Sequence, residues 1–298
     1  MRIALVSARP SPTTRALADV RLPGLELVPM TPLEAASSLR PGDAALGRLD
    51  VRPTLDGVEE GLWALGVVAA REVVVLNGPG TLLATHDKLL TARILRRARV
   101  PHPLTRHVHH DRPPVVLPPP VVLKPRHGSW GRHVTLCETE AELAEALERV
   151  RGEGWFRAHG ALLQEVVPPT GSDLRIVVAG GRMVGAVRRV AAPGEWRTNV
   201  ALGAERLPAD PPPAAIALAL TAAHATSAAL VGIDLLPTPD GGHVVLEVNG
   251  AADFTSAYRP SGDIFVETVL ELAQAARTGE ANSNLATLRS ARRRSSVG

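Results

Sequence analysis

Short apolar runs alternate with a helix-like segment in the first third of the chain, and this pattern limits the fold more than any other feature. Residues 2–6, 26–29, 44–47 and 73–76 read as short strands, and residues 57–70 carry apolar positions at helical spacing. Parallel strands need a crossover connection between them, which is usually a helix. The sequence therefore predicts that the chain begins with an α/β unit built on a parallel sheet.

The remainder of the chain mixes helices with hairpins, which is typical of an α+β arrangement. A helix is predicted up to about residue 99, with Thr85 or Asp87 as its cap and Lys88 in its first turn. Gly180-Gly181 would turn a hairpin between two strands. Further helices are predicted at 138–151, 214–230 and 264–277, and further strands at 121–123, 161–167, 174–179, 183–190, 232–236 and 244–248.

Composition argues against several classes of protein. Hydrophobic residues make up 45% of the 298 residues and charged residues 21%, as in an ordinary globular protein. No apolar run approaches the roughly 18 residues of a membrane span, so we expect no membrane association. Aromatic residues form only 3% and do not interleave with basic ones, which argues against nucleic-acid binding. The one cysteine, Cys137, fits a buried packing position and a cytoplasmic location.

Lysine occurs at only two of the 33 basic positions, Lys88 and Lys124. Lys124 follows the apolar run 121–123 and leads into a loop that contains Gly128 and Gly131. A compact ammonium group suits a phosphate oxygen, and a glycine-rich loop can bring backbone N–H groups onto phosphates. Neither a GxGxxG nor a GxxxxGK[ST] pattern occurs, so the common dinucleotide and P-loop motifs are excluded. The alternative is biased composition that has left two lysines at random.

Three oxygen-bearing side chains fall on a predicted hairpin near the end of the chain. Glu247 and Asn249 are two residues apart on one strand, so their side chains share a face, and Asp234 lies on the preceding strand. Carboxylates in apolar strands are costly unless they are paired or bind a cation. Two carboxylates and an amide suit Mg²⁺. The alternative is a polar face that points to solvent.

These pieces occur in an order that resembles the ATP-grasp carboxylate–amine ligases of the RimK and LysX group. The matching segments are His86-Asp-Lys88, Lys124 with GSWGR, QEVV, SDLR, VRR, WRTN, GID and LEVN, and they span roughly residues 45–270. GSWGR together with LEVN is closer to LysX-type ligases than to RimK itself. The resemblance implies an ATP-grasp fold, with an N-terminal α/β (pre-ATP-grasp) domain and two lobes that grip ATP.

The resemblance also implies domain boundaries. The N-terminal domain would cover residues 1–84, the central lobe residues 85–163 and the C-terminal lobe residues 164–277. The final segment, 278–298, has a basic and polar composition and is predicted to be a disordered tail.

Roles for individual residues follow from the same resemblance. Lys124, Arg197 and Asn199 would act on the reacting phosphates. Mg²⁺ would be held by Asp234, Glu247 and Asn249, and substrate carboxylates by Arg175, Arg188 or Arg189. The ATP-binding set would comprise Lys88, Lys124, Gly128, Ser129, Trp130, Gly131, Gln164, Glu165, Val166, Val167, Asp173, Arg197 and Asn199.

The implied reaction joins an amine to a carboxylate through an acyl phosphate, with ATP and Mg²⁺ (two ions, or Mn²⁺ in their place) and release of ADP. The amino acid would be glutamate or a relative, and the acceptor a carrier protein, a ribosomal protein or a small metabolite. A homo-oligomer is expected. Two alternatives remain open: a small-molecule dipeptide or natural-product amide ligase, and a non-catalytic ATP-binding regulatory protein.

Several residues depart from the family pattern or give weaker signals. Asp253 stands where LysX-type ligases carry a glutamate, and Val166 replaces an aromatic residue at the adenine edge. Trp130 could pack against a neighbouring lobe or a substrate. The histidine-rich segment 102–110 lies among prolines, so we expect an exposed linker rather than a metal site.

Overall fold

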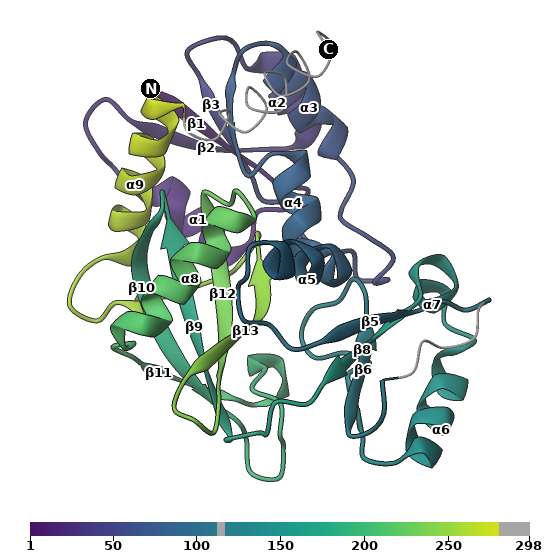
Figure 1. Cartoon of the computed structure of the whole chain (residues 1–298). Coiled ribbons are helices and arrows are strands. Elements are labelled where there is room, and N and C mark those ends of the chain that lie inside the picture. Colours follow the sequence, from purple (N-terminus) through teal and green to yellow (C-terminus); the bar gives the residue numbers. More distant parts are fainter. Residues whose placement is uncertain (112–116, 280–298) are drawn as a thin grey trace, which may run out of the picture.

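A computed structural model of the chain describes residues 1–111 and 117–279, and it contains three β-sheets (Figure 1). No helix within those two ranges is long and apolar enough to cross a membrane. The predicted basic tail lies, from residue 280 onward, outside the described residues. The three sheets follow the chain from N- to C-terminus, in broad agreement with the predicted α/β unit and two further lobes.

The first sheet is parallel, as predicted, with the order β2-β1-β3-β4. Two of its connecting helices, α1 and α2, were not predicted. Each is short and begins with a hydroxyl cap, Ser11 or Thr31, followed directly by proline, which suits the first helical position. The bounds are β1 (Arg2–Val6), α1 (Pro12–Asp19), β2 (Glu26–Met30), α2 (Pro32–Ser38), β3 (Ala44–Gly47), α3 (Leu62–Ala70), β4 (Val74–Leu76) and α4 (Pro79–His86).

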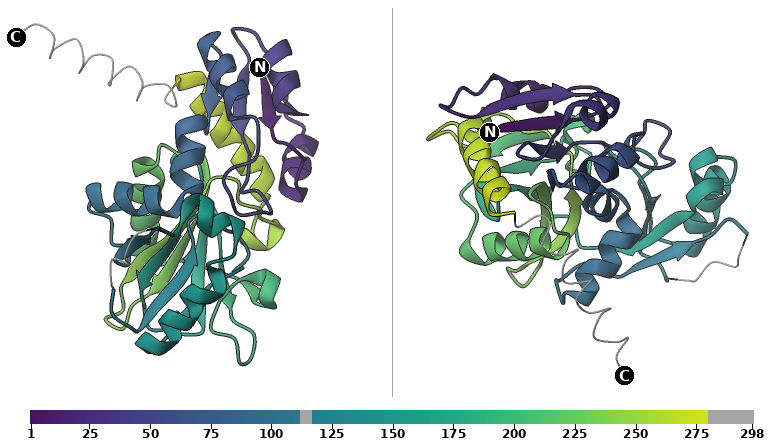
Figure 2. Two further views of the ribbon diagram at one scale, coloured as in Figure 1. Left: turned by 90° about the vertical axis from the view of Figure 1, so that its right-hand side faces the viewer. Right: turned by 90° about the horizontal axis from the view of Figure 1, so that it is seen from above.

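The second sheet is antiparallel, with the order β5-β8-β6-β7, and α6 packs against it. Seen from above, this sheet and its helices form a lobe to one side of the others (Figure 2). Its core is a separate hydrophobic cluster that includes Leu123, Cys137 and Phe156. The bounds are β5 (Thr105–Val108), β6 (Val121–Pro125), β7 (Thr135–Cys137), α6 (Glu140–Val150), α7 (Gly154–His159) and β8 (Ala161–Glu165).

The third sheet is also antiparallel, with the order β11-β10-β9-β12-β13. Helix α5 packs against its strand β13 and its helix α8. The bounds are α5 (Lys88–Arg97), β9 (Ser172–Ala179), β10 (Arg182–Val190), η1 (Val200–Leu202), β11 (Glu205–Pro208), α8 (Pro213–Ala225), β12 (Leu230–Pro237), β13 (His243–Asn249), η2 (Ser256–Tyr258) and α9 (Ile264–Thr278).

The first and third sheets share one hydrophobic core. Leu5 of β1, Val177 of β9 and Leu272 of α9 belong to the same cluster of buried residues. Helix α9 contacts β4 of the first sheet as well as β9 and β10 of the third (Figure 1). The two sheets therefore form one packed unit, and the second sheet is the part of the molecule that stands apart from it.

The bounds of two predicted helices were wrong, and a further short helix was not predicted. Gly78-Pro-Gly80 begins this unpredicted helix, α4, because proline is well suited to a first helical position. The helix predicted at 214–230 ends at Ala225, and Leu230 is already the first residue of β12. The helix predicted at 57–70 begins only at Leu62.

The histidine-rich segment is not an exposed linker throughout, since it contains β5. The Nδ1 atom of His102 lies 2.6 Å from the carbonyl oxygen of Val245, and the Nε2 atom of His107 lies 2.8 Å from that of His159. These two rings are half-buried and hold neighbouring strands and loops in place.

Candidate functional site

A pocket lies between the second and third sheets. Most residues proposed from the sequence line it: Lys88, Lys124, Gly128, Ser129, Trp130, Gly131, Gln164, Glu165, Val166, Val167, Asp173, Arg189, Arg197, Asn199, Asp234 and Glu247. Arg175, Arg188 and Asn249 are not among the lining residues.

Lys124 is a buried cation in the wall of this pocket. It lies on β6, and its side-chain ammonium donates a hydrogen bond to Oε1 of Gln164, 2.6 Å away. Burial and the nearby charge of Lys88 lower the pKa of Lys124 to about 8, although Glu247 counteracts them. The ammonium group is therefore weakly compensated, and an anion in the pocket would stabilise it.

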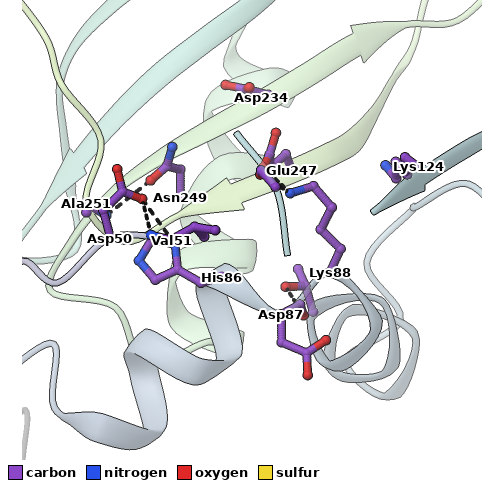
Figure 3. A network of polar contacts seen from close by, with 12 residues as sticks. Asp50, Val51, His86, Asp87, Lys88, Lys124, Asp234, Glu247, Asn249 and Ala251 are labelled. Carbon is purple, nitrogen blue, oxygen red and sulfur yellow. Dashed lines mark hydrogen bonds and ion pairs between the residues drawn. The ribbon is translucent and has the colours of Figure 1, made fainter. Parts of the chain in front are cut away.

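Lys88, the first residue of α5, contacts both strand β13 and the glycine loop. Its Nζ atom lies 2.9 Å from a carboxylate oxygen of Glu247 (Figure 3). It also donates to the carbonyl oxygen of Gly128. Asp87, rather than Thr85, caps the helix and accepts two hydrogen bonds, of 2.8 and 2.6 Å, from the guanidinium of Arg126. Lys88 is thus held in place by the capped start of its helix, by the glycine loop and by strand β13.

The glycine loop is held by Arg197, which lies in the segment between β10 and η1. Its guanidinium donates to the carbonyl oxygen of Gly131 at 3.0 Å and forms an ion pair with Glu195 at 2.8 Å. The hydrogen bond from Arg197 lowers the pKa of Glu195 to about 2. Trp130, in contrast, is 46% exposed, and the guanidinium carbon of Arg132 lies 5.1 Å from its ring centroid. Arg197 therefore connects the two walls of the pocket across the loop.

We expect Gly131→Ala to reduce the rate of ADP formation about tenfold. Gly131 has φ +71°, and an added Cβ would lie 2.8 Å from Oδ1 of Asn199 and 3.1 Å from a methyl of Leu202. The left-handed backbone alone costs a non-glycine residue roughly 1–2 kcal/mol, and about 1.4 kcal/mol corresponds to tenfold. Steady-state ADP release measures the effect. Gly152→Ala, where a Cβ meets no atom within 4 Å, is the control and should match wild type. Equal rates for both variants would contradict a role for the loop.

The predicted metal-binding side chains lie on one face of the β12–β13 hairpin. Asp234 is directly opposite Glu247, and Gly232 is opposite Asn249. Asp234 is 2% exposed and accepts hydrogen bonds of 2.6 and 2.7 Å from Arg175, and Nη2 of Arg189 lies 2.9 Å away. Burial raises the pKa of Asp234, but the two guanidinium groups overcome this and lower it to about 2. The carboxylate is therefore ionised and held by cations.

Asp173 belongs to the same network. It accepts two hydrogen bonds from the Arg189 guanidinium, one of them 2.8 Å long, and a third of 2.6 Å from Oγ1 of Thr198. Burial raises the pKa of its carboxyl group, and the charge of Arg189 opposes the rise. Asp173 lines the pocket yet is only 1% exposed, so it meets the pocket through a small part of its surface.

The donor set fits Mg²⁺ by its chemistry. Asp234, Glu247 and Asn249 offer two carboxylates and an amide oxygen, which are hard-oxygen ligands. In the structure their oxygens are engaged otherwise: Glu247 with Lys88, Asp234 with two arginines, and Oδ1 of Asn249 with the N–H of Ala251 at 3.1 Å. Lysine and arginine thus compensate the carboxylate charge that a cation would otherwise balance.

The three arginines predicted to bind substrate differ in placement. Arg175 and Arg189 are engaged by Asp234 and Asp173 inside the third sheet. Arg188 is exposed and projects from the opposite face of β10 from the buried Arg189. The structure therefore brings two of these arginines to the carboxylates of the site, and it does not bring Arg188 into the pocket.

Sequence reasoning missed several residues that hold the pocket together. The Arg126 pair with Asp87 and the Glu195 pair with Arg197 were not predicted, although Glu195 stands only two residues before Arg197. Gln164 was predicted at the adenine edge, but its side chain binds Lys124. Within the described residues, the backbone N–H groups of Val166 and Val167 have no hydrogen-bond partner.

Comparisons with known proteins agree with this geometry. Residues 85–271 match the model of the RimK-like ATP-grasp domain. The glutamate–LysW ligase ArgX of Sulfurisphaera tokodaii is 29% identical over 74% of this chain and 80% of its own length. The α-aminoadipate–LysW ligase LysX of Saccharolobus solfataricus is 31% identical over 67% of this chain and 74% of its own.

A solved structure shares the fold. The RimK domain protein ATP-grasp from Sphaerobacter thermophilus superposes with a TM-score of 0.65 at 24% identity, over 91% of this chain and 99% of that one. Because the family model covers more than half of the chain, the assignment does not depend on a single motif. The chain therefore belongs to the RimK-like ATP-grasp family.

Proposed function

We propose that this ATP-grasp ligase forms an amide bond between a carboxylate and the amine of glutamate or a related amino acid, with release of ADP and phosphate. One observation carries the proposal: both lysines of the chain line the same pocket as the carboxylate of Glu247 on β13. Lys124 is buried in its wall, and Lys88 pairs with Glu247 at 2.9 Å. Cations beside oxygen ligands suit the transfer of a phosphoryl group, which needs charge neutralisation and positioning.

The chemistry proceeds in two steps. The carboxylate oxygen attacks the terminal phosphorus of ATP and ADP leaves, which gives an acyl phosphate. The amine nitrogen then attacks the acyl carbon and phosphate leaves, while the amine gives up a proton. No protein nucleophile is required, and enclosure of the site protects the acyl phosphate from water.

Different residues of the pocket would bind different parts of ATP. Lys88 and Lys124 would hold phosphate oxygens, and the loop 128–133 would cover them. The N–H groups of Val166 and Val167 have no hydrogen-bond partner in the described part of the chain, so they are available to the adenine edge, and Asp173 would meet the ribose. Arg197 and Asn199 would contact the transferring phosphate from the opposite wall.

Asp234, Glu247 and Asn249 would hold Mg²⁺, two ions in our proposal, with Mn²⁺ as a substitute. Bound there, Mg²⁺ would neutralise charge on the phosphates. Arg175 and Arg189 now compensate Asp234, and they would become available to a substrate carboxylate once that charge is balanced otherwise. The acceptor in our proposal is a carboxylate on a protein such as LysW or a ribosomal protein, or on a small metabolite.

Phosphorus NMR of the purified protein with MgATP tests this function. Amino acids are supplied singly, with and without protein and small-molecule fractions of the source cells. We expect ADP and phosphate to form only when an amino acid and a carboxylate-bearing fraction are both present. AMP and pyrophosphate would contradict the acyl phosphate route. ATP binding without turnover in any fraction would favour a regulatory protein.

A further inference from the structure

A second groove, distinct from the pocket described above, lies between helix α5 and strand β5. Part of its surface is apolar and comes from Leu89 and Ala92, which are buried on α5. Residues three or four apart on a helix are neighbours, so Arg93 and Arg96 lie beside these apolar positions. The groove therefore combines an apolar floor with basic side chains.

Four arginines line this groove together with a single carboxylate. Arg93 and Arg96 lie on α5, Arg99 lies just after it and Arg106 lies on β5, and the carboxylate is that of Glu165. All four arginines are exposed, and within residues 1–111 and 117–279 none of their guanidinium groups forms an ion pair or a hydrogen bond. Glu165 accepts a backbone N–H at 3.2 Å and pairs with none of them. Like charges around one groove repel each other, and a bound anion would remove this repulsion.

The two sides of the groove are close enough to interact. Helix α5 contacts β5 directly, at the place where the lobe of the second sheet meets the rest of the molecule (Figure 1). Burial lowers the pKa of His107 on β5, and Arg93 on α5 is one of the charges that lower it further. The field of one side therefore reaches the other, and a ligand of small-molecule size can contact both.

The groove also shares a wall with the pocket for ATP. Helix α5 packs against β13 and α8 of the third sheet, whereas β5 is the edge strand of the second sheet. The side-chain amide of Gln164 accepts a hydrogen bond from Lys124 in the pocket at 2.6 Å and donates one to Thr105 in the groove at 2.9 Å. Because the pocket lies between the same two sheets, a ligand that fixes α5 against β5 also fixes the two walls of the pocket.

We propose that this groove binds a small anion with two or more phosphate groups, which bridges the arginines of α5 to Arg106 of β5. The planar guanidinium group matches phosphate oxygens bidentately, so several arginines around one groove favour a ligand with several such groups. A phosphate group presents three acceptor oxygens and about two negative charges, whereas a carboxylate presents two oxygens and one charge.

The bridging anion would hold the lobe of the second sheet in the position described here, in which both walls of the ATP pocket are in place. We therefore expect the anion to strengthen the binding of ATP, because it stabilises the arrangement that ATP needs. The inference concerns ATP binding alone, so it does not depend on which carboxylate and amine the enzyme joins.

Calorimetric titration with inorganic triphosphate tests the site in protein that is first saturated with Mg²⁺ and the ATP analogue AMP-PNP. We expect one triphosphate to bind per chain, and Arg96→Gln to weaken its binding about tenfold or more, the loss typical of a hydrogen bond to a charged group. Arg97→Gln is the matched control, because Arg97 is exposed on the same helix but does not line the groove. It should bind triphosphate like wild type.

Three results would overturn the site. Equal losses in the two variants would indicate general attraction of anions to a basic surface. Binding that Arg96→Gln leaves unchanged would place the triphosphate elsewhere, and no binding by wild type would leave the groove without such a ligand. Both substitutions are at exposed helix positions, and glutamine is as good a helix former as arginine, so both variants should fold.

Parallel titrations with pyrophosphate, uridine diphosphate and poly-L-glutamate identify the kind of anion. Tighter binding of the nucleotide than of pyrophosphate would support a nucleotide as the ligand, and equal binding would support free polyphosphate. Binding of poly-L-glutamate in place of all phosphate compounds would overturn the proposal and indicate an acidic protein.

The effect on ATP is measured as the affinity for AMP-PNP at a fixed triphosphate concentration, in wild type and in Arg96→Gln. Any competition inside the ATP pocket is the same for both proteins, so the difference between them reports the groove. We expect AMP-PNP to bind wild type about fivefold or more tightly than the variant when triphosphate is present, and equally when it is absent. Equal affinities under both conditions would contradict the bridging role.

Discussion

Replacing Lys124 with alanine is expected to reduce ADP formation on the order of 10²–10³-fold, the effect of removing one donor that stabilises developing charge. The ammonium of Lys124 is buried, and among residues 1–111 and 117–279 its one hydrogen bond goes to Gln164. Its remaining N–H groups can therefore turn to a phosphate oxygen. The steady-state rate of ADP release in the presence of substrate, compared between the variant and wild type, measures the loss. Turnover close to wild type would remove Lys124 from the mechanism.

The same variant should remain folded. Burial disfavours the charged form of Lys124, so its removal takes a costly ion out of the wall and leaves the side chain of Gln164 with its second contact, to Thr105 at 2.9 Å. We expect the midpoint of thermal unfolding to stay within a few degrees of wild type or to rise. An unfolded variant would make loss of activity uninformative, and Lys124→Met, which keeps most of the volume, would then replace it.

The pKa of Lys124 gives this prediction a second readout. Its value in the free protein is lowered to about 8 from 10.5, so the ammonium loses its proton as the pH rises through 8. We expect the affinity of wild type for AMP-PNP to fall between pH 7 and pH 9, by up to about tenfold per unit above the pKa. Bound phosphate raises the pKa of Lys124, and the affinity stops falling only above that raised pKa. Lys124→Ala should show a flatter profile, and parallel profiles would contradict the assignment.

The sequence predicted the parallel sheet and the hairpins because both leave a periodic signal. Strands β1 and β3 are continuous apolar runs, as expected where both faces of a sheet are covered. Short helices such as α1 lack enough turns to show a pattern, and only their Ser-Pro start identifies them. Strand β5 contains arginine and histidine because it lies at the edge of its sheet, so composition alone suggested a loop.

Most of the residues proposed from the sequence line one pocket, but their pairings were not predicted. Scarcity of lysine, strand pattern and motif order singled out Lys88, Lys124 and Glu247, yet no pattern in the sequence shows that Lys88 of α5 pairs with Glu247 of β13. Partner choice depends on how α5 packs against β13, which is a property of the folded chain. For the same reason Arg175 and Arg189 were assigned to substrate, although in the free protein they compensate Asp234.

Glu247→Ala is expected to abolish ADP formation to a similar extent, on the order of 10²–10³-fold, while nucleotide binding without metal persists. Glu247 lies directly opposite Asp234 and balances the charge of Lys88 at 2.9 Å. Its removal takes away a carboxylate ligand for Mg²⁺ and leaves the ammonium of Lys88 free to bind phosphate. Affinity for AMP-PNP in the presence of a chelator should therefore match or exceed that of wild type.

A matched carboxylate in the same pocket separates this effect from a general change in charge. Glu165 also lines the pocket, but its side chain accepts the N–H of Leu104 at 3.2 Å. The segment 165–167 is proposed to meet adenine through its backbone. Glu165→Gln keeps both that backbone and the side-chain acceptor, so it should retain wild-type turnover. Glu247 is proposed to act through the metal, and Lys124 through the phosphate. Only the Glu247 variant should therefore need a higher Mg²⁺ concentration to reach half of its residual activity. An unchanged Mg²⁺ dependence would mean that Glu247 serves only to hold Lys88.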